Sequence, residues 1–315
     1  MTDSPLAPWL QPAWQRFVSS VAEDRVGHGL LVAGEAGLGK RILVERMVAR
    51  LLCQAPTGDG FACGMCASCV WREAGTHPDL LRIGPEEDTT IIKVAQVRAL
   101  GARAQLTGRA SDTRVIVVDP ADAMNGAAQN ALLKTLEEPP PGVHLLLVAD
   151  TPSRLLPTIR SRCQQIAVRP PDASTMQAWL AGRGVSLSPT MVALAAAHPG
   201  RAQGLADPNQ RARAEGVAAD LRDVRAGKAS ALAVSRRWAD EATAHVDDAI
   251  GWLRLWSWSQ GGALAVDASA PMGATPADLA RSYAAALVLR ERLRTPVKAP
   301  WLIHEWLVGW QSGAR

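Results

Sequence analysis

The residues with the clearest chemical potential form a glycine-rich loop, Gly34-Glu35-Ala36-Gly37-Leu38-Gly39-Lys40-Arg41. It matches the phosphate-loop pattern G-x-x-x-x-G-K, in which backbone N–H groups and a lysine surround nucleotide phosphates. The candidate ATP- or ADP-binding residues are the pattern's own: Gly34, Gly37, Gly39 and Lys40. The Ser or Thr that normally follows the lysine and ligates Mg²⁺ is replaced by Arg41. Arg41 could compensate phosphate charge or point away to solvent, and nucleotide binding by this loop stays open.

A second departure from an active ATPase follows the apolar run 115–118. Such an ATPase needs two carboxylates here, one for Mg²⁺ and one to polarise the attacking water. Asp119 can take the first role, but Pro120 fills the second position and has no acid–base chemistry. Asp122 is expected to serve a turn or a helix cap. The two losses predict that the chain does not hydrolyse ATP by itself.

Four of the five cysteines lie within 17 residues in the order C-x9-C-x2-C-x2-C. This spacing lets four thiolates converge on one tetrahedral ion and leaves no position for water, which predicts a structural zinc site rather than free thiols. The expected metal ligands are Cys53, Cys63, Cys66 and Cys69. Gly58, Gly60 and Gly64 would supply tight turns around the ion. An odd cysteine count argues against a disulfide framework, and Cys163 is expected to be a buried small hydrophobe.

These residues need elements to hold them in place. Short apolar runs predict strands, and helical spacing of Leu, Met and Val predicts helices between them. The strands are expected at 29–33, 80–83, 115–118, 145–149 and 164–168, and the helices at 42–52, 91–105 and 124–137. The alternation indicates an α/β fold of P-loop type, a parallel sheet with helices on both faces and with the cysteine module inserted.

After Pro170-Pro171 the strand signals disappear, and the remaining sequence is helical. We therefore expect three parts: a nucleotide-binding-like domain at 1–169 with the insertion at 53–69, a small helical part at 170–208, and an all-α domain at 209–315. Most of the eleven Trp residues fall late in the chain. They could be helix-packing core residues or an exposed seam for a partner.

Several motifs occur together in a characteristic order: the phosphate loop, the cysteine insertion, Gly75-Thr76-His77-Pro78-Asp79, the run Asn130–Pro140, and Ser161-Arg162-Cys163. Together they closely resemble the delta-prime subunits of the bacterial DNA polymerase III clamp loader, within the AAA+ family. The match covers about residues 28–168, and Pro8-Trp9-Leu10 also fits. The helical remainder agrees in length and class only.

The resemblance implies a role for Arg162, as an arginine finger acting in trans on ATP held by an adjacent motor subunit. Taken without the resemblance, Arg160 and Arg162 could equally be surface salt-bridge residues. Arg160 is expected to be orienting or structural. The resemblance also makes 170–208 a lid and 209–315 an oligomerising collar. The lid's nucleotide-sensing residue should lie near Gly200-Arg201, where Gly200 takes its place and Arg201 is one position away.

The implied function is that of a non-hydrolysing clamp-loader subunit. It would join tau/gamma motor subunits and a delta subunit to place the sliding clamp on primed DNA. The chain would then belong to the polymerase III holoenzyme without polymerase or autonomous ATPase activity. One alternative is an active tau/gamma-like AAA+ motor, which Arg41 and Pro120 oppose. Another is a zinc-dependent DNA-binding regulator, which the lack of His ligands and of a base-reading helix opposes.

Composition sets broad limits on these interpretations. The chain has 315 residues, of which 48% are hydrophobic and 20% charged, as in ordinary soluble proteins. No run approaches the roughly 18 apolar residues of a membrane span, and residues 1–27 lack a signal peptide, so we expect a cytoplasmic protein without a membrane partner. The net charge of +4 equals the surplus within 201–237, where eight basic residues face four acidic ones. That segment could face nucleic acid, contact an acidic partner, or form a solvated helical face.

Overall fold

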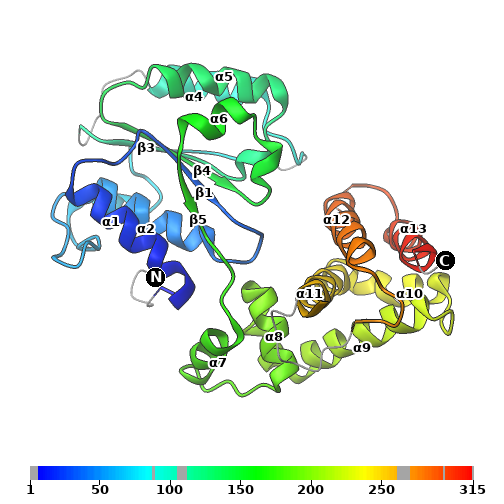
Figure 1. The fold of residues 1–315 in the computed structure, drawn as a ribbon. Coiled ribbons are helices and arrows are strands. Elements are labelled where there is room, and N and C mark those ends of the chain that lie inside the picture. The colour runs from blue at the N-terminus through cyan, green and yellow to red at the C-terminus, as the bar shows by residue number, and fades with distance from the viewer. Residues whose placement is uncertain (1–5, 87–88, 105–111, 261–269, 294, 314–315) are drawn as a thin grey trace. The chain divides into compact units, whose positions relative to one another are not determined.

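The computed structural model describes residues 6–86, 89–104, 112–260, 270–293 and 295–313. The chain divides into two compact units, Met1–Arg169 and Pro170–Arg315. The first unit is α/β and the second is helical throughout its described residues (Figure 1).

The first unit is built on a parallel five-stranded sheet in the order β2-β3-β4-β1-β5. Its strands are β1 (Gly29–Ala33), β2 (Leu80–Ile83), β3 (Arg114–Val118), β4 (Val143–Ala149) and β5 (Gln164–Ala167). The predicted α/β class is confirmed. All five strands occur where apolar runs predicted them, although β4 begins two residues earlier than expected.

Helices cover both faces of this sheet, as expected (Figure 1). One face packs against the 3₁₀ turn η1 (Pro8–Leu10), α1 (Gln11–Ala22) and α2 (Lys40–Leu52). The other packs against α4 (Val94–Ala104), α5 (Gly126–Glu137) and α6 (Pro157–Arg162). Side chains alternate between the two cores, as the period-two geometry of a strand requires: Leu30 faces α1 and α2, and Leu31 faces the opposite helices. The predicted helix 91–105 begins three residues later than expected, and residue 105 lies outside the described residues.

Short elements complete the first unit. The cysteine insertion between α2 and β2 carries α3, and the strand ends of β3 and β4 lead into 3₁₀ turns. These elements are α3 (Ala67–Glu73), η2 (Ala121–Ala123) and η3 (Pro152–Arg154).

The second unit is a bundle of helices around α11, which packs against α8, α9 and α12. Its elements are α7 (Ala173–Ala181), α8 (Pro189–Ala197), η4 (Pro199–Arg201), η5 (Gly204–Ala206), α9 (Pro208–Arg225), α10 (Ala231–Trp238), η6 (Ala239–Glu241), α11 (Ala242–Gln260), α12 (Pro276–Arg292) and α13 (Ala299–Ser312). The division at 208/209 stays a prediction. Across the described residues, no helix combines the length and apolarity that a membrane crossing requires.

The late tryptophans form core. Trp238, Trp256 and Trp310 are completely or almost completely buried, and Trp256 stacks on Trp310 with ring centroids 6.5 Å apart. Trp301, by contrast, is 66% exposed. The core interpretation therefore holds for the buried tryptophans of this unit, and Trp301 alone among those of α13 lies open to solvent.

Four arginines of segment 201–237 form ion pairs inside the second unit. Arg201 and Arg213 both pair with Asp248 of α11. Arg225 pairs with Asp278 of α12, and Arg237 pairs with Asp220. Part of the positive charge of this segment is thus neutralised by ion pairs within the second unit. The roles expected for segment 201–237 did not include such internal ion pairs.

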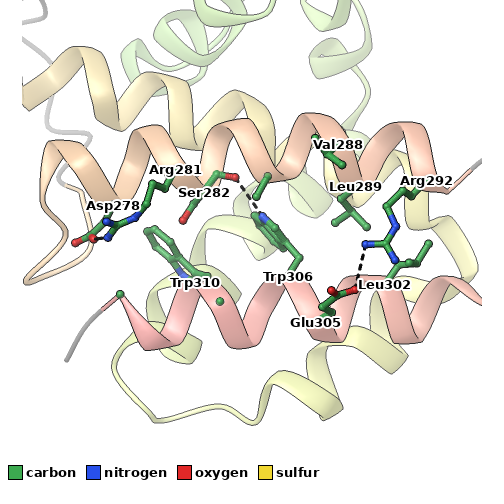
Figure 2. A pocket seen from close by; sticks show the side chains of 13 residues that line it. Asp278, Arg281, Ser282, Val288, Leu289, Arg292, Leu302, Glu305, Trp306 and Trp310 are labelled. Atoms are coloured by element: carbon green, nitrogen blue, oxygen red, sulfur yellow. Dashed lines mark hydrogen bonds and ion pairs between the residues drawn. The ribbon is translucent and has the colours of Figure 1, made fainter.

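Helices α12 and α13 enclose a groove of about 480 Å³, shown in Figure 2. Trp306 and Trp310 lie along it, and the Trp306 indole N–H donates to Ser282 O at 3.2 Å. The charged groups at its ends are already paired with each other, Arg292 with Glu305 and Arg281 with Asp278. Those pairs leave no net charge that would select one kind of ligand.

Candidate functional site

The phosphate loop adopts a conformation that only its glycines permit. Gly37 and Gly39 have φ values of 82° and 85°, in the left-handed region, and Gly39 is the N-cap of α2. A Cβ on Gly34 would lie 2.4 Å from Val168 O, so the backbones approach too closely for any side chain. The indole N–H of Trp9 donates to Leu38 O at 2.9 Å, which ties the segment before α1 to the loop. The loop thus leads into α2, whose first-turn N–H groups lack acceptors within the helix and form a positive end.

Lys40 is 4% exposed and is held by two groups of its own chain. Its ammonium donates to Glu35 O at 2.7 Å and lies 2.5 Å from Asp150 Oδ1, just after β4. Burial lowers the pKa of Lys40 because it disfavours the charge, while the carboxylate of Asp150 opposes this effect. The lysine that should reach phosphates therefore already has a carboxylate partner.

Arg41 neither points away from the site nor stands alone beside the loop. Its guanidinium donates two hydrogen bonds to one carboxylate, Nε to Asp119 Oδ2 at 2.7 Å and Nη2 to Asp119 Oδ1 at 2.9 Å. Asp119 was the expected Mg²⁺ ligand, and both of its oxygens are engaged by Arg41. Arg41 itself stands where the second Mg²⁺ ligand, a Ser or Thr, would be. The residues present do not fit a magnesium site.

Asp122 serves a turn, as expected. Its carboxylate accepts hydrogen bonds from the backbone N–H groups of Asp150 and Thr151, at 3.2 and 2.9 Å. It therefore fixes the turn after β4 that presents Asp150 to Lys40.

The four predicted metal ligands come together. The Sγ atoms of Cys53, Cys63, Cys66 and Cys69 all lie within 4.8 Å of one another. Tetrahedral coordination with bonds of about 2.3 Å places thiolates about 3.8 Å apart, so the cluster fits a metal ion. Backbone N–H groups donate to Cys53 Sγ at 3.2 Å and to Cys63 Sγ at 3.3 Å, as suits thiolate acceptors. This cluster could hold a metal ion with no position left for water.

A buried polar chain that the sequence did not reveal joins this module to the sheet. His77 Nδ1 accepts from the backbone N–H of Asp79 at 3.1 Å, so the proton must sit on Nε2, which lies 2.5 Å from Ser68 Oγ. Ser68 precedes the predicted ligand Cys69 in α3. The Asp79 carboxylate in turn accepts from Arg114 Nη2 of β3 at 3.2 Å. All four side chains are buried. In the sequence, only the motif Gly75–Asp79 pointed to these residues, and it did not indicate which side chain His77 would contact.

Arg162 is the last residue of α6, and its side chain is 39% exposed. It lies 2.8 Å from Glu137 Oε1 of α5 and donates to Thr158 O at 3.2 Å. The Arg162 carbonyl lies beside Gly29, the first residue of β1, since a Cβ on Gly29 would be 3.4 Å from it. The phosphate loop follows Ala33, the last residue of β1. Four steps of about 3.3 Å, from Gly29 to Ala33, separate these ends by roughly 13 Å. Arg162 therefore lies at the opposite edge of the sheet from the phosphate loop of its own chain.

Cys163 and Arg160, on either side of Arg162, are less exposed than Arg162. Cys163 is 7% exposed, and burial raises the pKa of its thiol to about 11, as expected for a small buried hydrophobe. Arg160 is half-buried, and its carbonyl accepts from Gln165.

In the second unit, Arg201 pairs with Asp248 and also donates to Ala244 O at 3.1 Å. These contacts hold Arg201 against α11.

A glycine-rich loop between an interior parallel strand and a helix, on this sheet, defines a P-loop nucleotide-binding-type protein. The chain belongs to the family described as DNA polymerase III, delta subunit, whose model matches residues 9–172.

Curated relatives agree with this assignment. The chain is 45% identical to the DNA polymerase III subunit delta' of Pseudomonas aeruginosa over 174 residues, which cover 55% of the chain and 52% of the relative. It is 37% identical to the Escherichia coli subunit delta', covering 63% of the chain and 60% of the relative. A gamma/tau subunit of Mycobacterium bovis is 36% identical, covering 51% of the chain and 28% of the relative. The chain spans little more than half the length of the delta' relatives it matches. The resemblance to delta-prime subunits is confirmed.

Proposed function

We propose that the chain is a subunit of the DNA polymerase III clamp loader that does not hydrolyse ATP itself and donates Arg162 to ATP on a neighbouring subunit. The observation that carries this proposal is the position of Arg162. It is exposed, and it lies at the edge of the sheet away from its own phosphate loop. An arginine in that place serves a phosphate only if the phosphate belongs to another chain.

The ion pair of Arg162 with Glu137 is compatible with movement of the Arg162 side chain to a phosphate on a neighbouring subunit. Exposed ion pairs contribute about 0–1 kcal/mol, so releasing the guanidinium costs little. A nucleotide phosphate carries more negative charge than one carboxylate, and it too can accept two hydrogen bonds from one guanidinium. We therefore regard the Glu137 pair as the resting position of the side chain in the free subunit.

The degenerate phosphate loop supports the non-hydrolysing part of the proposal. Arg41 occupies both oxygens of Asp119, and Pro120 offers no group that could polarise water. A nucleotide bound at this loop would lack both the metal and the base that hydrolysis requires.

The proposed partners are tau/gamma motor subunits and a delta subunit, and through the complex the sliding clamp and primed DNA. Residues 170–208 would act as a lid and residues 209–315 as the collar that holds the ring together. Because the substrate of this complex is replicating DNA, we place the chain in the cytoplasm. We propose zinc as the ion of the four-cysteine module, with a structural role.

Two measurements test these proposals. Native mass spectrometry of the purified chain should show one zinc ion, which Cys69→Ser abolishes; a chain without metal would refute the zinc site. Mixing the chain with tau/gamma and delta homologues should give a defined hetero-oligomer by native mass. The absence of a complex would refute the clamp-loader role.

The alternative, an active motor of the gamma/tau kind, is distinguished by the isolated chain. We expect no ATP turnover above background. Turnover at the rate of an intact P-loop ATPase would instead establish the motor, despite Arg41 and Pro120.

A further inference from the structure

The ion pair between Arg41 and Asp119 has a consequence for what the phosphate loop can bind. We propose that Arg41 takes the place of Mg²⁺, so that this loop binds the phosphate chain of a nucleoside di- or triphosphate without a divalent cation. This inference concerns the chain's own loop and does not depend on Arg162.

The first step is the exclusion of the metal. Arg41 is the second residue of α2, at the position where a hydroxyl would ligate Mg²⁺. Its two hydrogen bonds, at 2.7 and 2.9 Å, engage both oxygens of Asp119. A Mg²⁺ ion bound to Asp119 would have to break this bidentate pair and would then lie beside a permanently charged guanidinium.

The second step is that the phosphate cradle itself is retained. Gly37 and Gly39 keep the left-handed turns that bring the loop around the start of α2, and the backbone at Gly34 lies against Val168 too closely for a side chain. The first-turn N–H groups of α2 stay directed at the loop, where an anion is favoured. The loop therefore keeps a backbone shape that can surround an anion.

The third step is the supply of positive charge. Arg41 is 58% exposed, and the pair with Asp119 uses only two of the five N–H donors of a guanidinium. The remaining donors could serve a phosphate at the position where active phosphate loops recruit a divalent cation. Lys40 lies beside them, with Asp150 and Glu35 O as partners that a phosphate can replace. Arg41 thus supplies a fixed guanidinium, its charge offset in part by Asp119, where an active site recruits a divalent ion.

A metal-free nucleotide should therefore be the preferred ligand. Nucleotide that arrives with Mg²⁺ on its phosphates brings a second cation towards Arg41. We expect ADP and ATP to bind the full chain at least as tightly in EDTA as in excess Mg²⁺.

The test is isothermal titration of the full chain with ADP and with ATP, in EDTA and in excess Mg²⁺, for the wild type, Arg41→Ser and the control Arg98→Ser. Arg98 is exposed on α4, across the sheet from the loop. In EDTA, Arg41→Ser should weaken binding by about tenfold or more, the effect of losing one charge-assisted hydrogen bond. Adding Mg²⁺ should strengthen binding to Arg41→Ser and leave the wild type and Arg98→Ser unchanged or weaker.

Mn²⁺, followed by electron paramagnetic resonance, gives a second readout. With ADP present, we expect no Mn²⁺ bound at the loop of the wild type and one ion bound to Arg41→Ser. Two results would overturn the proposal: no nucleotide binding to the wild type in either buffer, or wild-type binding that Mg²⁺ tightens about tenfold. Both concern the wild type, so they decide the matter even if Arg41→Ser does not fold.

Discussion

The Arg162 guanidinium lies 2.8 Å from Glu137 Oε1, and both side chains are partly open to solvent. Glu137 ends α5 within the run Asn130–Pro140, and Arg162 ends α6 in Ser161-Arg162-Cys163. Two motifs that seemed independent in the sequence are thus in direct contact. Glu137 holds Arg162 at the surface.

Glu137→Gln tests how firmly that contact holds the arginine. Because both side chains are exposed, we expect the free energy of unfolding to fall by less than about 1 kcal/mol. Urea unfolding of the two chains under identical conditions measures the difference. A loss above about 2 kcal/mol would mean that Arg162 is a structural anchor and not a side chain available to a partner.

His77 should couple the metal module to the sheet. His77→Ala leaves the Ser68 hydroxyl and the Asp79 N–H without their partner, which should lower the free energy of unfolding by about 2–4 kcal/mol for two buried hydrogen bonds. His77→Gln retains a donor towards Ser68, and His77→Asn retains an acceptor for Asp79 N–H, so each should lose less. Denaturant unfolding with the metal site saturated measures all three. A change below about 0.5 kcal/mol for His77→Ala would show that the chain of hydrogen bonds is dispensable.

His198 should make the second unit sensitive to acid. Burial, followed by the charge of Arg201, lowers the pKa of His198 to about 4, whereas an unfolded histidine titrates near 6.5. The folded state therefore binds its proton later than the unfolded state as pH falls. This contribution to stability is fully present above about pH 6.5 and is lost progressively down to about pH 4.

The size of that effect can be isolated by substitution. Between pH 7 and pH 5 the His198 contribution should fall by about 2 kcal/mol. His198→Gln should remove that part of the pH dependence and leave the parts due to carboxylates unchanged. Unfolding free energies of the wild type and of His198→Gln at the two pH values give the comparison. Parallel pH profiles for the two chains would contradict it.

Arg225 should be the main polar support of the second unit. Its side chain is 1% exposed, pairs with Asp278, and donates to the carbonyl oxygens of Gly273, Trp310 and Gly313. Arg225→Ala should therefore cost about 3–5 kcal/mol, since it removes the buried partner of Asp278 and the donor to three carbonyl oxygens. Arg281 pairs with the same Asp278 but is 71% exposed, so Arg281→Ala should cost less than about 1 kcal/mol. Equal losses in the two variants, measured by denaturant unfolding, would contradict this ranking.

Local patterns predicted much of the fold and the convergence of the four cysteines. Buried parallel strands appear in the sequence as continuous apolar runs. Four cysteines separated by short spacers lie close together in the folded chain, so both features can be recognised from the sequence alone. The phosphate loop could be recognised in the same way, because its backbone conformation requires glycines at fixed positions.

The interactions that define the sites could not be predicted, because they join distant residues. Arg41 and Asp119 are 78 positions apart and meet only because α2 and the end of β3 lie at the same edge of the sheet. The pairing of Arg201 with Asp248 likewise needed the packing of α11. Arg162 lies at the edge opposite its own loop because it precedes β5, which pairs in parallel with β1, and this position follows from the predicted parallel sheet.

The most direct measurement is ATP turnover by the reconstituted assembly, with primed DNA and sliding clamp present, for the wild type, Arg162→Ala, Arg162→Lys and Arg154→Ala. Arg154 is an exposed arginine of η3 and serves as the matched control. Arginines supplied in trans are worth about 10³–10⁵ in rate at the site they serve, so Arg162→Ala should abolish hydrolysis at the adjoining site, and Arg162→Lys should restore little of it. Arg154→Ala should behave as the wild type. Unchanged stimulated turnover by Arg162→Ala, in an assembly of intact composition, would contradict the trans role of Arg162.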